Sequence, residues 1–93
     1  MNEQVKDFLE QGAALLKAAG AREVYVFGSV AEGRVRESSD VDLAVSGLPP
    51  AIFFATMARL ADLFDRAVDL VDLDDVSPFT THLRSKGLLQ RVA

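Results

Sequence analysis

A Gly-Ser pair and two closely spaced aspartates have the residue types and spacing of a site for a metal ion and a phosphate. Gly28-Ser29 ends an apolar run, ten residues separate Ser29 from Asp40, and Asp40 and Asp42 open a second apolar run. In a β-strand, residues two apart point to the same face, so Asp40 and Asp42 share one face and Val41 points to the other. Two carboxylates this close repel each other unless a cation lies between them. A hard cation such as Mg²⁺ binds carboxylate oxygens and then the phosphate oxygens of a substrate.

Gly28-Ser29 would supply the phosphate half of such a site. Glycine allows close backbone approach, and a serine that opens a short helix offers N–H groups and a hydroxyl to phosphate. The alternative is a simple strand-to-helix turn with Ser29 as the N-cap. Asp40 also has an alternative, as a turn residue bonded to its own backbone. That alternative does not explain Asp42, which lies inside a predicted strand, where aspartate is disfavoured.

A third carboxylate follows the same pattern in a later apolar run. Asp69 alternates with Val68 and Leu70 within a predicted strand over residues 67–73, so its side chain points away from theirs. Asp72 has the parity of Leu70 and is predicted to point away from the site. We interpret the further group Asp72, Asp74 and Asp75 as a solvated strand end and helix cap.

The elements that must position these residues follow from hydrophobic periodicity and from glycine and proline stop signals. We predict helices over 2–19, 29–32, 50–65 and 79–86, strands over 22–27, 40–45 and 67–73, and a candidate terminal strand over 88–92. Ser77 is the expected N-cap of the last helix, with Pro78 at its first position. The aspartate faces must stay open for metal, so the long helices must cover the opposite faces. This predicts an α/β (α+β) domain with a small mixed sheet of three to four strands and helices mainly on one face.

Two side-chain groups outside this pattern have competing interpretations. The helix over 50–65 carries one apolar stripe for the core, and Ile52, Phe54 and Leu63 lie beside or outside it. This excess of apolar residues would suit a surface for a partner protein. His82 is the only histidine, and we interpret it as a surface residue of a short helix.

Composition limits the class of protein. Ninety-three residues form one small domain, and 49% hydrophobic residues suffice for one core. The absence of cysteine excludes disulfides and thiolate metal sites and fits a cytoplasmic protein. A formal net charge of −4 argues against direct nucleic-acid binding. The first residues are too charged for a signal peptide, and no apolar run is long enough to span a membrane.

The spacing of Gly28-Ser29 and Asp40-x-Asp42 resembles the signature of the DNA polymerase β-like nucleotidyltransferases. The short length and the run SSDVDLAV resemble the minimal nucleotidyltransferases of HEPN/MNT toxin–antitoxin pairs, with a likeness that extends from the first strand to about Leu73. The resemblance implies the polymerase β-like fold in a single domain over 1–93. It also implies that Asp69, in a Val-Asp-Leu-Val setting, completes the catalytic set. Asp40, Asp42 and Asp69 would then bind two Mg²⁺ ions, with Mn²⁺ as a substitute.

The sequence departs from this family at two positions in the phosphate segment. Val30 and Glu32 stand where the family commonly has arginine, and a glutamate near a triphosphate is repulsive. Arg34 and Arg36 follow closely and could compensate, because arginine forks around phosphate oxygens. A solvated loop is the alternative interpretation of these two arginines. We therefore expect the nucleotide to be bound by Gly28, Ser29, Arg34 and Arg36.

The resemblance implies a metal-dependent enzyme that moves a nucleoside monophosphate, most often AMP from ATP, to a hydroxyl group of a HEPN toxin, and so acts as its antitoxin. A chain of this length leaves little room for an acceptor pocket, so we expect the acceptor on another protein or domain, with an oligomer as a further option. One alternative is a non-catalytic antitoxin that sequesters a HEPN partner, which Glu32 favours. A second is a small-molecule nucleotidyltransferase, which would need an additional acceptor domain.

Overall fold

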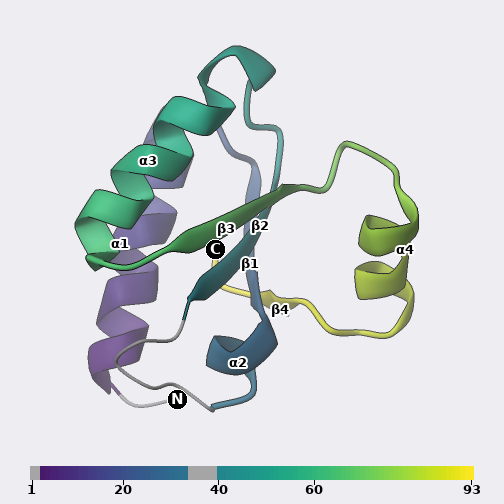
Figure 1. Ribbon diagram of the computed structural model, residues 1–93, viewed down its shortest axis with the longest axis horizontal. Coiled ribbons are helices and arrows are strands. Elements are labelled where there is room, and N and C mark those ends of the chain that lie inside the picture. The colour runs from purple at the N-terminus through teal and green to yellow at the C-terminus, as the bar shows by residue number, and fades with distance from the viewer. Residues whose placement is uncertain (1–2, 34–39) are drawn as a thin grey trace.

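The computed structural model describes residues 3–33 and 40–93, which form a four-stranded mixed sheet with helices on both faces (Figure 1). The elements follow in the order α1 (Glu3–Ala19), β1 (Glu23–Phe27), α2 (Gly28–Ala31), β2 (Val41–Ser46), η1 (Pro50–Ile52), α3 (Phe53–Phe64), β3 (Val68–Asp72), α4 (Pro78–Ser85) and β4 (Gln90–Arg91). Each predicted element is present, with ends that differ by at most three residues. The predicted fold class is confirmed.

The sheet has the strand order β3-β2-β1-β4. β1 pairs antiparallel with β2 and with β4, whereas β2 pairs parallel with β3. A parallel pair needs a crossover connection, and η1 and α3 provide it between β2 and β3. This crossover allows β2 and β3 to run in the same direction, with their residues directly opposite each other.

The main core lies between one face of the sheet and the two long helices, which lie side by side (Figure 1). It contains the residues that strand parity and helical spacing predict for the core, among them Leu9, Leu16, Val24, Val26, Val41, Leu43, Val45, Leu60, Phe64 and Leu70. Gly12 allows the close approach of α1 to α3, because a β-carbon there would lie 2.5 Å from Cζ of Phe64. The backbone of α1 at Gly12 therefore packs against the side chain of Phe64 in α3.

A second, smaller core lies on the opposite face of the sheet, where α4 packs (Figure 1). Its buried residues are Phe27, Ala44, Leu73 and Leu83. The prediction of helices mainly on one face therefore holds for the long helices, while α4 covers part of the face that carries the aspartates. Tyr25 is half-buried and packs against this second core.

The start of α4 is determined by a capping box at its first turn. The side-chain oxygen of Ser77 accepts a hydrogen bond from the backbone N–H of Thr80, at 3.1 Å, and the hydroxyl oxygen of Thr80 accepts one from the backbone N–H of Ser77, at 2.9 Å. Pro78 occupies the first helical turn, as the sequence predicts.

Within residues 3–33 and 40–93, no helix combines the length and apolar character that a membrane span requires.

The second long helix differs from the prediction at its start. Residues Pro50–Ile52 form a 3₁₀ turn, and the α-helix begins at Phe53. Two prolines precede it, and Pro49 is held in an extended conformation with φ −59° and ψ 132°, so the chain enters the helix through the tighter turn. Asp65, in a left-handed conformation with φ 52°, ends the helix.

Candidate active site

Asp42 and Asp69 lie directly opposite each other on neighbouring strands. In the parallel pairing of β2 and β3, Asp42 is in register with Asp69, and in the antiparallel pairing of β1 and β2 it is in register with Phe27. Residues in register point to the same face of a sheet, so both carboxylates lie on the face opposite the main core. Asp40 immediately precedes β2 and is exposed.

The electrostatics of this row leave Asp42 with uncompensated negative charge. Partial burial raises the pKa of Asp42 above its ordinary value of 3.8, and the negative charges of Asp69 and then Asp40 raise it further. Asp42 is half-buried, while Asp40 and Asp69 are exposed. A site that raises the pKa of a carboxyl group through neighbouring carboxyl groups favours the binding of a cation.

Gly28 brings the start of α2 against this row of carboxylates. It has a positive φ of 70°, and a β-carbon at this position would overlap Oδ2 of Asp42. Only glycine accepts both the backbone conformation and the contact without strain. The chain therefore passes from β1 into α2 directly beside Asp42, and Ser29 follows Gly28 as the second residue of α2.

Ser29 is not the N-cap of the short helix, which corrects one of the two interpretations of the Gly-Ser pair. α2 begins at Gly28, and its N-cap is Phe27, with no side-chain capping bond within the described part of the chain. Ser29 is half-buried within α2, and its role in phosphate binding stays a prediction.

The three carboxylates suit Mg²⁺ by the chemistry of their oxygen donors. Asp42 and Asp69 are in register, and Asp40 is close enough to affect the pKa of Asp42. Over residues 3–33 and 40–93, however, no three His, Cys, Asp or Glu side chains are positioned to hold one metal ion together. The assignment of Asp40, Asp42 and Asp69 as metal ligands and catalytic residues therefore stays a prediction. Arg34 and Arg36 lie outside the described residues.

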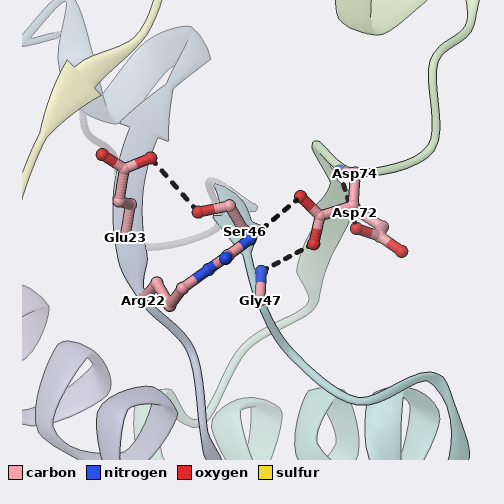
Figure 2. Close-up of polar contacts among 6 residues, drawn as sticks. All are labelled: Arg22, Glu23, Ser46, Gly47, Asp72 and Asp74. Atoms are coloured by element: carbon pink, nitrogen blue, oxygen red, sulfur yellow. Dashed lines mark hydrogen bonds and ion pairs between the residues drawn. The ribbon is translucent and has the colours of Figure 1, made fainter.

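Asp72 and Asp74 have structural partners at the other end of β3 (Figure 2). Oδ1 of Asp72 accepts a hydrogen bond from the backbone N–H of Asp74, at 2.9 Å, and Oδ2 of Asp74 accepts one from the backbone N–H of Gly47, at 2.7 Å. Arg22 forms an ion pair with Asp74, with 3.8 Å between nitrogen and oxygen. These contacts join the ends of β2 and β3 and agree with the interpretation of a strand end.

A pocket of about 430 Å³ lies beside Gly28 and was not predicted from the sequence. Glu32 of the chain after α2 lines it together with Phe79 and His82 of α4, and the segment 87–90 lines it as well. His82 is exposed, as expected of a surface residue. The one sequence signal for this pocket is the spacing of Phe79, His82 and Leu83, which places them on one side of a helix.

Comparison with known proteins places the chain and its fold in a family. The family model described as "Polymerase beta, Nucleotidyltransferase" matches residues 3–89, so the chain belongs to the polymerase β-like nucleotidyltransferase family. Among curated proteins, no significant match is found.

Solved structures with the same fold include minimal nucleotidyltransferases and toxin–antitoxin complexes. A candidate minimal nucleotidyltransferase is 32% identical, with a TM-score of 0.73 over 90% of this chain and 86% of that one. A toxin–antitoxin structure with AMP-PNP is 27% identical, with a TM-score of 0.75 over 90% and 72% of the two chains. A third, the complex of a tri-AMPylated HEPN toxin with an MNT antitoxin from Shewanella oneidensis, is 23% identical, with a TM-score of 0.69 over 95% and 71%, and shows the shared fold.

Proposed function

We propose that this protein is a metal-dependent nucleotidyltransferase that transfers a nucleoside monophosphate, AMP from ATP, to a hydroxyl side chain of a HEPN-domain partner and acts as its antitoxin. The observation that carries the proposal is the register of Asp42 with Asp69 beside Gly28. Two carboxylates of neighbouring strands and a glycine that allows close backbone approach form the minimum needed to hold metal ions and a triphosphate.

We assign each residue a role from its position in the candidate site. Asp40 and Asp42 would hold the ion that binds the triphosphate, and Asp69 would share a second ion beside the acceptor hydroxyl. Bound Mg²⁺ would supply neutralisation of the phosphate charge and a lower pKa of that hydroxyl. The backbone at Gly28 and the hydroxyl of Ser29 would bind the terminal phosphates, with Arg34 and Arg36 as further phosphate ligands.

The transfer itself exchanges a phosphoanhydride bond of the triphosphate for a phosphate ester bond to the acceptor. The acceptor oxygen forms a bond to the α-phosphorus, and the bond from that phosphorus to the oxygen bridging it to the β-phosphorus breaks. Pyrophosphate leaves, and the proton of the hydroxyl passes to solvent. The protein contributes position and electrostatics more than covalent chemistry.

The choice of partner rests on two kinds of support. The chain is 27% identical to a protein in a toxin–antitoxin structure with AMP-PNP, and it shares its fold with an MNT antitoxin bound to an AMPylated HEPN toxin. In this chain, Phe54 is 75% exposed and Ile52 is 37% exposed at the start of the second long helix. Exposed apolar side chains of this size suit contact with a partner protein.

The test is to incubate the protein with the product of its neighbouring gene as the candidate HEPN partner, Mg²⁺ and each of the four nucleoside triphosphates, and to weigh the partner by intact mass spectrometry. We expect a mass gain of one or more nucleoside monophosphates, largest with ATP. Asp42→Asn should abolish the gain. Asp72→Asn makes the same chemical change at a strand end and should preserve it.

A non-catalytic antitoxin is the second candidate function. Glu32 favours it, because this exposed carboxylate lies close to Gly28 in the chain and opposes triphosphate binding. This candidate predicts a tight complex with the HEPN partner and no mass change with any triphosphate. That result would rule out the transfer reaction while preserving the antitoxin role.

A further inference from the structure

We propose that the pocket of about 430 Å³ between α2, α4 and the segment 87–90 binds the nucleobase of the triphosphate, with Phe79 as the stacking surface. A purine is the preferred base, because its larger ring system stacks over more of an aromatic side chain. The inference rests on the proposed function, because it names a subsite for the nucleotide that this function consumes. It assigns a binding role to residues of α4, which lie outside the carboxylate and Gly-Ser motifs.

The position of the pocket is the first argument. Gly28 lines the pocket and also contacts Asp42, so the pocket begins where the row of carboxylates ends. The base and the phosphates of one nucleotide are separated by a single ribose. A triphosphate held at Gly28 and Asp42 therefore has its base within reach of this pocket.

The lining of the pocket is the second argument. Its volume lies within the range of about 300–1,000 Å³ that is typical of small-molecule sites. Phe27, Ala31, Leu83 and Leu89 supply apolar walls, and the side chains of His82 and Gln90 supply polar groups. Apolar walls with a few polar groups are what a flat heteroaromatic base requires, because stacking holds its face and hydrogen bonds read its edge.

Phe79 is the residue best placed to stack on the base. It is 51% exposed, and its ring packs edge to face against Phe27 with 6.0 Å between ring centroids. This contact orients an aromatic ring that is still half accessible, and Leu88, another pocket residue, is 42% exposed. Burial under a bound base would explain why these apolar side chains are left accessible.

The experiment compares ATP with inorganic tripolyphosphate, which has the phosphates and lacks the base. Calorimetric titrations with Mg²⁺ should show that Phe79→Ala weakens ATP binding about tenfold, a typical loss for one stacked base, and leaves tripolyphosphate binding unchanged. Phe79→Tyr should restore ATP affinity. Val76→Ala is the matched control, since Val76 is an 85% exposed apolar residue outside the pocket, and it should change neither affinity.

The outcomes separate this inference from the proposed function. Wild-type protein should bind ATP and GTP more tightly than CTP and UTP, and His82→Ala should reduce that difference. If Phe79→Ala binds ATP as wild type does, or weakens both ligands equally, the base pocket is wrong and the nucleotidyltransferase proposal stands. If wild type binds neither ligand, or Asp42→Asn binds both as well as wild type, the proposed function fails and the base pocket fails with it. Thermal melts of each variant test whether the domain is still folded.

Discussion

Gly28 and Asp42 are in such close contact that a β-carbon at residue 28 would occupy the space of the carboxylate oxygen Oδ2. This contact joins the Gly-Ser pair and the aspartate pair, which ten residues separate in the sequence. It means that a phosphate bound at the backbone of residue 28 and a cation bound by Asp42 would be neighbours. The requirement for glycine is therefore set by the site as well as by the turn.

We predict that Gly28→Ala reduces metal-dependent ATP affinity at least tenfold, because the new methyl group must displace the carboxylate of Asp42. Gly33→Ala is the matched control. Gly33 has a similar φ of 75°, but, apart from its chain neighbours, none of the described residues 3–33 and 40–93 has an atom within 4 Å of its β-carbon position. Both variants should lose about 1–2 kcal/mol of stability from the left-handed backbone. Gly28→Ala should lose further stability through the clash with Asp42, and it should also lose ATP affinity. Equal ATP binding by the two variants would contradict the close contact.

The raised pKa of Asp42 predicts that Asp42→Asn is more stable than wild type at neutral pH without metal. The folded pKa of Asp42 lies above the unfolded value of 3.8, so between these two pKa values the folded protein binds more protons than the unfolded protein does. The stability of the folded protein therefore falls as pH rises through this range. Asparagine does not ionise and avoids this loss. Urea denaturation in EDTA should show the difference at pH 7 and its disappearance below pH 3.8.

Two controls separate this effect from a general change in charge. Asp72→Asn should not gain stability, because the Asp72 carboxylate accepts the backbone N–H of Asp74 and this bond is weakened in the variant. Mg²⁺ at pH 7 should stabilise wild type more than Asp42→Asn and so narrow the gap. A wild-type protein that is more stable than Asp42→Asn at pH 7 in EDTA would refute the prediction.

We predict that Asp69, and not Asp72, is the third catalytic carboxylate. Asp69 is in register with Asp42, whereas Asp72 is in register with Val45 and bonds to the turn that follows. Asp69→Asn should abolish nucleotide transfer, measured by the mass of the partner, while much of the ATP affinity is retained. Asp72→Asn should transfer at close to the wild-type rate. The reverse pattern would mean that the functional carboxylates of β3 lie at its other end.

The exposed start of the second long helix predicts a separation of stability from partner binding. Phe54 is 75% exposed and makes an edge-to-face contact with Phe53. Phe54→Ser should change the free energy of unfolding by no more than about 0.5 kcal/mol, and should weaken the complex with the HEPN partner about tenfold or more. Arg59→Ser, at an exposed position of the same helix, is the control and should have a smaller effect. Unchanged affinity in calorimetry for Phe54→Ser would place the partner elsewhere.

The sequence alone determined the elements and the faces of the strands. The direction of a strand side chain depends only on a period of two, so the parity of Asp42 and Asp69 could be read locally, and so could the core positions of Val41 and Leu43. Ser77 and Pro78 likewise marked the start of α4, because capping is decided within one turn. The errors at helix ends, such as the 3₁₀ turn at Pro50, come from local geometry that periodicity does not describe.

Only the tertiary structure decided which residues meet. The register of Asp42 with Asp69 depends on how the crossover through α3 returns the chain to β2, and this pairing is set by the packing of the whole core. The overlap of a β-carbon at Gly28 with Asp42 depends on the antiparallel pairing of β1 and β2. The pocket beside Gly28 exists because α4 packs on the second face of the sheet, through contacts between residues that lie far apart in the sequence. A local pattern determines which way a side chain points, whereas its neighbours are decided by long-range packing.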